Sequence, residues 1–223
     1  GGKGITQRIV NDFIGLGVDV ISGGNHSLAQ RGCDDLYHKE ERLLRPANFP
    51  PGTPGQGMIL YNSAAGFPVA VINICGRAFM KEFDDPFRCA DKLIEQARQT
   101  TPMIIVDFHA ETTSEKVAMG WYLDGRVSAV LGTHTHVQTA DERVLPAGTA
   151  YITDVGMTGP HDSVIGARKD AVLATMLTLR PHRFETADPR DVRLHGAFVE
   201  IDPIEGHARR IERVRVDLGD FQD

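Results

Sequence analysis

Two histidines, His134 and His136, are the feature of this sequence that points most directly to chemistry. They stand two residues apart and follow the apolar run 127–131. Side chains two residues apart at the end of a β-strand point to the same side, and imidazole is a common ligand of transition metals. The pair therefore predicts a metal site at the end of a strand.

Two other apolar segments end in residues of the same kind. Asn25 and His26 follow the segment 18–22 and two glycines, and His109 follows the segment 104–108. Each has a simpler explanation when taken singly, because asparagine tolerates left-handed turns and most histidines are ordinary hydrogen-bonding residues. Their shared position favours one site, since ligands of open α/β sheets bind beyond the carboxyl ends of the strands.

The charge of these ligands limits what they can bind. Asparagine and neutral histidine carry no charge, whereas two divalent ions bring four positive charges. Asp107, Glu111 and Asp154 are the carboxylates closest in sequence to the predicted strand ends. Either the site holds one ion, or the acidic ligands of a second ion lie elsewhere.

The elements that would carry these residues alternate between β and α patterns, which predicts an α/β domain. Strands are predicted at 18–22, 57–61, 69–74, 103–108, 127–132 and 150–153, and helices at 5–16, 28–40, 86–99, 113–123 and 170–179. The segments 196–201 and 210–216 alternate apolar and charged residues, which predicts an antiparallel hairpin. Helix starts are indicated by Ser27-x-x-Gln30, Thr112-x-x-Glu115 and Asp85-Pro86.

Composition predicts a globular cytoplasmic protein with a single domain over residues 1–223. Hydrophobic residues make up 41% of the 223 residues, and no apolar stretch approaches the length of a membrane span. The net charge of -6 argues against a surface built for nonspecific nucleic-acid binding. The three cysteines lack a CxxC spacing, which argues against a disulfide framework or a thiolate zinc site.

Several blocks of sequence carry a resemblance to a known family. They are Gly24-Asn25-His26, the block 107–116 around His109, Gly132-Thr133-His134-Thr135-His136 and the block 153–166. Over nearly its whole length the chain resembles the calcineurin-like metallophosphoesterase superfamily, and within it the bacterial YmdB-like cyclic-nucleotide phosphodiesterase family. One extra threonine stands between the glycine and the histidine pair. The resemblance implies an αββα sandwich of two mixed β-sheets flanked by helices.

The resemblance also indicates a departure at the N-terminus. Members of the family begin with a strand that ends in a metal-binding aspartate, then a helix and a strand that ends in Glu-Asn, before a glycine turn like residues 1–4. This chain starts at the glycine turn, so we expect it to lack a β-α-β unit of about 30 residues. That unit would supply the acidic ligands, and we expect residues 1–223 alone to be impaired. An open sheet edge would favour pairing between copies, so a homo-oligomer remains open.

For function, the resemblance implies hydrolysis of a small-molecule phosphodiester, with 2′,3′-cyclic nucleotides favoured. Two divalent ions, manganese or iron with zinc as an alternative, would lie about 3.5 to 4 Å apart and share a bridging hydroxide that acts as the nucleophile. Asn25, His109 and His134 would bind one ion and His136 the other. His26 would serve as general acid or stabilise the transition state.

Other readings of the sequence stay open at this point. His161, Asp162 and Ser163 would contact the substrate, although a structural turn capped by Asp162 or Ser163 explains them equally well. A metal-dependent amidohydrolase also uses a His-x-His pair, but normally on the first strand of a closed (β/α)₈ barrel. A regulatory or RNA-associated scaffold with no activity and no membrane contact is the third hypothesis.

Overall fold

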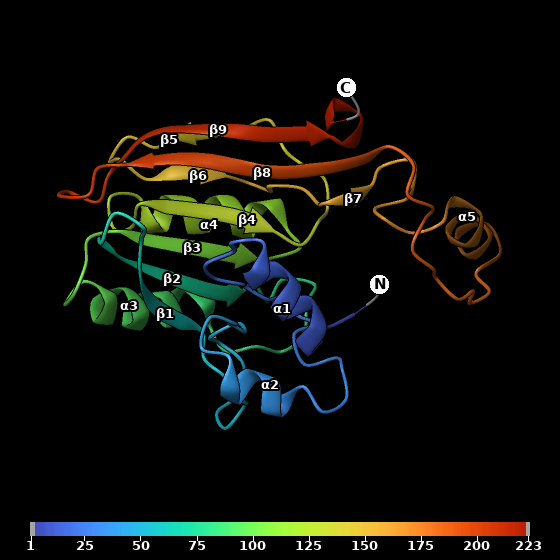
Figure 1. Cartoon of the computed structure of the whole chain (residues 1–223), viewed down its shortest axis with the longest axis horizontal. Helices are drawn as coiled ribbons and strands as arrows, with labels where there is room; N and C mark the ends of the chain where they lie inside the picture. The colour runs from blue at the N-terminus through green and yellow to red at the C-terminus, as the bar shows by residue number, and fades with distance from the viewer. Residues whose placement is uncertain (1–2, 222–223) are drawn as a thin grey trace.

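A computed structural model describes residues 3–221, and its centre is a six-stranded mixed sheet (Figure 1). Its strands, in spatial order, are β1 (Met58–Asn62), β2 (Pro68–Cys75), β3 (Ile104–His109), β4 (Ala129–Thr133), β6 (Ala150–Ile152) and β5 (Arg143–Val144). The four inner strands are parallel, and the two outer strands run antiparallel to their neighbours. The carboxyl ends of the inner strands consequently meet along one edge.

A second sheet contains β7 (Gly159–Pro160), β8 (Val192–Ile201) and β9 (Ala208–Asp217). The predicted hairpin is confirmed, and both strands are longer than expected. The prediction of two mixed sheets is wrong for this smaller one, which is antiparallel throughout. The cause is local: a tight connection at 202–207 joins β8 to β9, and a connection this short can only reverse the chain.

The larger sheet is covered on both faces. The helices are α1 (Gln7–Gly15), α2 (Asp34–Lys39), α3 (Pro86–Ala97), α4 (Thr113–Leu123) and α5 (Lys169–Thr178), followed by a 3₁₀ turn at Leu218–Phe221. Ile94 of α3 and Met119 of α4 pack on one face of the sheet, and Ile211 of β9 packs with Ile152 on the other. Helix α5 stands apart from both sheets (Figure 1).

The order of layers is therefore helix, sheet, sheet. Across residues 3–221, no helix lies over the outer face of β8 and β9, where Leu194 is 48% and Phe198 51% exposed (Figure 1). The outer helical layer of the expected sandwich is thus not seen in the described part of the chain. The open sheets also exclude the closed barrel that the amidohydrolase hypothesis requires. No helix in the described residues is long and apolar enough to cross a membrane.

Two predicted elements near the N-terminus are wrong. The segment 18–22 is not a strand, because only Ile21 forms a bridge, to Leu43. The predicted helix 28–40 is reduced to α2, since Gly32 adopts a φ of 73° and interrupts the chain before Asp34. Ser27 caps no helix; its hydroxyl donates to the carbonyl of Gly24 and accepts from the amide of the same residue.

The two helices beside the site start differently. Asp85 caps α3 as predicted, with its carboxylate accepting from the amides of Phe87 and Arg88. Thr112 is the N-cap of α4, but its side chain makes no capping hydrogen bond. The predicted capping box is wrong, because the Glu115 carboxylate accepts from backbone amides in the loop after β2.

Candidate metal centre

Three side chains from distant parts of the sequence meet beyond the carboxyl ends of β3 and β4. His109 is the last residue of β3, His134 directly follows β4, and Asn25 lies in the turn after Gly24. The Nε2 atom of His109 lies 3.0 Å from Oδ1 of Asn25 and 3.0 Å from Nδ1 of His134. The predicted grouping of these three residues is therefore present in the structure.

The remaining ring nitrogens indicate where the protons are. The other nitrogen of His134, Nε2, lies 2.8 Å from the carboxylate of Glu111, which can only accept a hydrogen bond. Nδ1 of His109 lies 3.1 Å from Oγ1 of Thr133, whose own proton goes to Asp107 at 2.7 Å. Both rings therefore carry their proton away from the centre, and two nitrogen lone pairs and one amide oxygen converge on it.

Three converging acceptors without a proton between them fit a cation. Ligands of an octahedral divalent ion lie about 2.1 Å from it, which places neighbouring ligand atoms about 3 Å apart. The distances around His109 agree with that spacing. Hydrogen bonds from the outer ring nitrogens to Glu111 and Thr133 are also the usual support of metal-binding histidines. The donor set consequently fits one divalent ion.

Carboxylate ligands are not part of this set. Over residues 3–221, no three His, Cys, Asp or Glu side chains gather closely enough to hold a metal ion by themselves. The three carboxylates considered from the sequence have other partners: Glu111 binds His134, Asp107 binds Thr133 and Asn73, and Asp154 binds Lys116. Burial raises the pKa of Asp107 to about 6.

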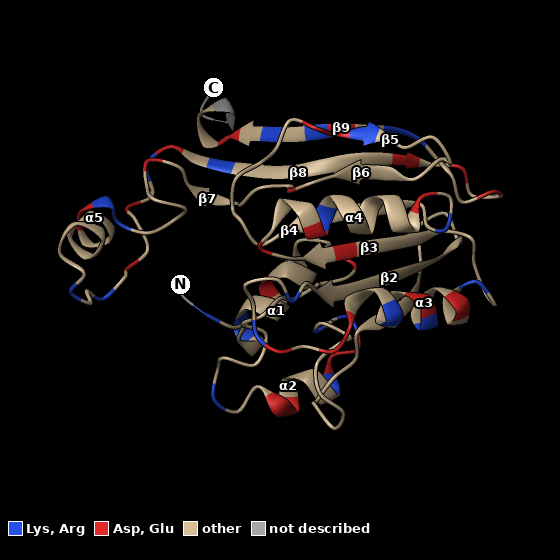
Figure 2. Cartoon of the chain, turned by 180° about the vertical axis from the view of Figure 1, so that it is seen from behind, with Lys and Arg blue, Asp and Glu red and all other residues tan. Residues whose placement is uncertain are grey.

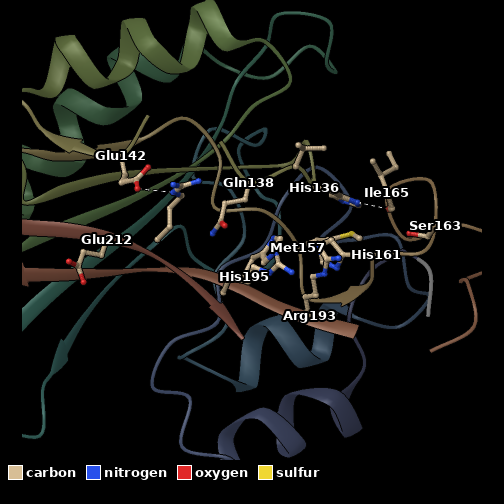
Figure 3. A pocket seen from close by; sticks show the side chains of 13 residues that line it. His136, Gln138, Glu142, Met157, His161, Ser163, Ile165, Arg193, His195 and Glu212 are labelled. Atoms are coloured by element: carbon tan, nitrogen blue, oxygen red, sulfur yellow. Dashed lines mark hydrogen bonds and ion pairs between the residues drawn. The ribbon is translucent and has the colours of Figure 1, made fainter. Parts of the chain in front are cut away.

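His136 and His134 make different hydrogen bonds. Both residues follow the end of β4 and have positive φ angles, 102° for His134 and 67° for His136, so the alternation of a strand no longer applies. Nδ1 of His136 donates to the carbonyl of Ile165 at 2.9 Å (Figure 3). The two histidines therefore have separate hydrogen-bond partners, and the expectation that both serve one metal site stays a prediction.

His26 is an exposed residue that directly follows Asn25. Partial burial, followed by the positive charges of Lys3 and Lys81, holds the pKa of His26 below its ordinary value. Because burial and nearby cations both favour the neutral ring, His26 is largely uncharged near neutral pH. Burial also lowers the pKa of His109, to about 3, with contributions from the neighbouring His134 and Lys116.

Two glycines permit the close approach of these segments. A Cβ atom on Gly24 would lie 2.3 Å from Cε1 of His109, and one on Gly132 would lie 1.7 Å from the carbonyl oxygen of Thr153. Neither distance is tolerated by a real side chain. Gly24 thus lets the Asn25 turn reach His109, and Gly132 lets β4 and β6 meet immediately before the histidine turn.

Lys116 was not singled out from the sequence, although a signal for it exists. It shares one face of α4 with Met119, Gly120 and Leu123, at the spacing of a buried helical stripe. Only 1% of the Lys116 side chain is exposed, and its ammonium group lies 2.6 Å from the Asp154 carboxylate. A lysine in an apolar stripe is an indication of a buried ion pair.

A pocket of about 830 Å³ opens beside His136. Its lining comes mainly from the turn after β4, the loop around β7, and strands β8 and β9 (Figure 3): His136, Val137, Gln138, Glu142, Met157, His161, Ser163, Ile165, Arg193, His195, Glu212, Arg213 and Arg215. Basic residues recur along β9 (Figure 2). The pocket wall therefore combines imidazole rings with several guanidinium groups.

The predicted substrate loop lies partly on this pocket. His161 lines it and packs against His195, with ring centroids 4.5 Å apart. The Ser163 hydroxyl donates to the carbonyl of Pro160 at 2.6 Å and accepts from the amide of Gly166, which is the behaviour of a turn residue. Asp162 pairs with Lys169. Substrate contact by these three residues stays a prediction.

The fold is that of the metallophosphoesterase superfamily, and the chain belongs to its YmdB-like protein family, whose model matches residues 1–214. The 2′,3′-cyclic-nucleotide 2′-phosphodiesterase of Bacillus subtilis is 50% identical over 215 residues, which are 96% of this chain and 81% of that protein. The expected absence of an N-terminal unit stays a prediction.

Two solved structures are similar over almost the whole chain. A hypothetical protein from Thermus thermophilus superimposes with a TM-score of 0.90 at 41% identity, covering 97% of this chain and 83% of that one. A phosphatase from Mycoplasma pneumoniae gives a TM-score of 0.88 at 33% identity, with 97% and 78% covered. These similarities support the architecture described above.

Proposed function

We propose that this protein is a metal-dependent phosphodiesterase that hydrolyses cyclic nucleotides, with 2′,3′-cyclic nucleotides as the favoured substrates. The observation that carries the proposal is the convergence of three atoms: His109 Nε2 lies 3.0 Å from Asn25 Oδ1 and 3.0 Å from His134 Nδ1. The activity named for the Bacillus subtilis relative supports the choice of substrate. A scaffold without activity would have no need of converging lone pairs.

Each candidate site residue has a separate role in this proposal. Asn25, His109 and His134 hold one divalent ion, and His136 contributes to a second. The mixture of nitrogen and oxygen donors favours manganese or iron, with zinc as an alternative. When bound, such ions supply Lewis-acid chemistry that neutralises charge on a phosphate group. His26, which is largely uncharged near neutral pH, acts beside the leaving oxygen as a hydrogen-bonding or proton-transferring group.

The pocket beside His136 is the proposed place for the nucleotide. Its volume of about 830 Å³ is within the usual range of small-molecule sites. Arg193 and Arg213 on its wall belong to ion pairs, with Asp191 and Glu142, that an incoming phosphate could rearrange. His161 and Met157 offer a ring and a soft side chain against which a base could pack.

A substitution at His26 tests its role. In protein loaded with Mn²⁺, His26→Ala should lower the rate of 2′,3′-cyclic AMP hydrolysis by about 10²-fold or more, because the imidazole beside the leaving oxygen is lost, while the bound manganese measured by atomic absorption stays the same. His182→Ala, at an exposed histidine far along the chain, is the matched control. Undiminished turnover in the His26 variant would remove this residue from the mechanism.

Removal of metal tests the wider proposal. Dialysis against EDTA should abolish hydrolysis, and added Mn²⁺ should restore it, because the proposed chemistry depends on bound ions. Metal content and rate are measured on the same samples. Full activity in protein shown to contain no metal would contradict the proposal.

A further inference from the structure

The buried pair Lys116 and Asp154 lies directly beneath the histidine turn and takes no part in the chemistry proposed above. Each side chain is only 1% exposed. Lys116 reaches from α4 to the ends of two strands, donating to the carbonyl of Thr133 at 2.7 Å and to Oδ2 of Asp154 at 2.6 Å. The pair therefore joins the helix to the points where β4 and β6 end.

Asp154 fixes the residue between the two histidines. Its Oδ2 atom accepts from the backbone amide of Thr135 at 3.0 Å and from the Thr135 hydroxyl at 2.8 Å, and Oδ1 accepts from the amide of Gly156 at 2.9 Å. Thr135 is thus tied down through both its backbone and its side chain. Together with the bond from Lys116, the Oδ2 atom receives three hydrogen bonds.

The turn that Asp154 holds is a strained one. His134 and His136, on either side of Thr135, both have positive φ angles, which are uncommon for residues with a side chain. Such conformations persist only where surrounding contacts enforce them. The hydrogen bonds to Thr135 are contacts of that kind, and the direction of the His134 ring toward His109 depends on this backbone.

We propose that Asp154, held in place by Lys116, is a positioning residue that sets the conformation of the His134-Thr135-His136 turn and thereby the geometry of the metal ligands. The predicted effect of Asp154 on metal affinity rests on the function proposed above. The predicted effect on the orientation of the His134 and His109 rings does not. A buried ion pair adds little stability compared with apolar packing, so its use here is geometric.

Thr135 offers a mild test, because it is half-buried and the buried pair stays intact. Thr135→Val removes the hydroxyl that donates to Asp154 and keeps the shape of the side chain. In metal-free protein, nitrogen-15 NMR of the histidine rings should show changed signals for His134 and His109. Thr135→Ser, which restores the hydroxyl, should return these signals to their wild-type positions.

Thr139→Val is the matched control. The Thr139 hydroxyl accepts from the amide of Asp154 at 2.9 Å and donates to its carbonyl, so the substitution removes hydrogen bonds to the same residue without touching its carboxylate. This variant should lose stability but leave the His134 and His109 signals unchanged. If Asp154 only stabilised the fold, the His134 and His109 signals would change in both Thr135→Val and Thr139→Val in proportion to the loss of stability, or would change in neither variant.

Titration with Mn²⁺ alone provides the second measurement. Thr135→Val should bind Mn²⁺ about tenfold more weakly than wild type, and Thr135→Ser and Thr139→Val should bind it normally. Ring signals that stay unchanged in Thr135→Val would overturn the positioning role. Changed signals in a protein that binds no Mn²⁺ even as wild type would support the positioning role and contradict the proposed function.

Lys116→Met tests the other member of the pair. This variant should shift the same His134 and His109 signals, because Asp154 loses its strongest partner. If it does not fold, the comparison between Thr135→Val and Thr139→Val decides the matter.

Discussion

Gly24 is the residue on which the approach of Asn25 to His109 depends. Because a Cβ atom here would meet the His109 ring at 2.3 Å, Gly24→Ala should weaken Mn²⁺ binding at least about tenfold and cost about 1 to 3 kcal/mol of stability. Gly15 has open space around its Cα, so Gly15→Ala is the control and should leave binding unchanged. Isothermal titration checks both, and equal affinities would contradict this role of Gly24.

His109 and Asp107 have opposite effects on the stability of the metal-free protein as the pH changes. The pKa of His109 falls to about 3, below the value near 6.5 of an unfolded histidine, so its contribution to stability is full above about pH 6.5 and is lost as the pH falls toward 3. The pKa of Asp107 rises to about 6, so its contribution is full below about pH 4 and is lost as the pH rises through 6. The two effects oppose each other between about pH 4 and 6.

Asp107→Asn should separate these two effects. The variant keeps the contribution of His109 and loses that of Asp107, so its free energy of unfolding should rise more steeply with pH than that of wild type between about pH 4 and 6. Urea unfolding in the presence of EDTA at several pH values measures the slope. A slope equal to that of wild type would show that Asp107 does not bind its proton more tightly in the folded state.

At the scale of whole elements, α3 begins with a side-chain capping hydrogen bond and α4 does not, and substitutions at the two N-caps should therefore change the free energy of unfolding differently. Asp85→Ala removes two capping hydrogen bonds and should cost about 1 kcal/mol of stability. Among residues 3–221 the buried hydroxyl of Thr112 has no hydrogen-bond partner, so Thr112→Val should be neutral or stabilising. Urea unfolding of both variants checks this contrast, and a comparable loss in Thr112→Val would contradict it.

Strands and helices with a strong local pattern were predictable from the sequence. The buried runs of β3 and β4 and the proline start of α3 are examples, since local preference and tertiary packing agree there. The segment 18–22 has an equally apolar pattern, but a strand also requires paired neighbours, and only Ile21 has one. The positive φ of Gly32 was likewise not evident from the helical pattern around it.

The candidate site was predictable in its members more than in its geometry. Strand order brings His109 and His134 together, and that follows from the α/β pattern. His136 bonds to the carbonyl of Ile165, and the left-handed turn that carries it is bonded to the distant Asp154. A contact across such a sequence separation has no local signature, so the conformation of this turn could not be predicted from the residues around the histidines.

At the scale of the molecule, stability depends on packing between the two sheets. Ile211 of β9 is 8% exposed and packs against the larger sheet, so Ile211→Ala should cost about 2 to 4 kcal/mol through a cavity between the layers. Ile204→Ala is the control: this side chain is 84% exposed in the turn after β8, so the substitution should change stability by less than about 0.5 kcal/mol. Urea unfolding compares the two, and equal losses would contradict the importance of this interface.

The most direct test of the proposed metal centre is a crystal of the protein soaked in Mn²⁺ and measured by anomalous scattering. We predict a manganese peak within about 2.3 Å of Asn25 Oδ1, His109 Nε2 and His134 Nδ1, because these acceptors converge with no proton between them. No peak at this position at saturating Mn²⁺, with the three side chains still within contact distance of one another, would contradict the account.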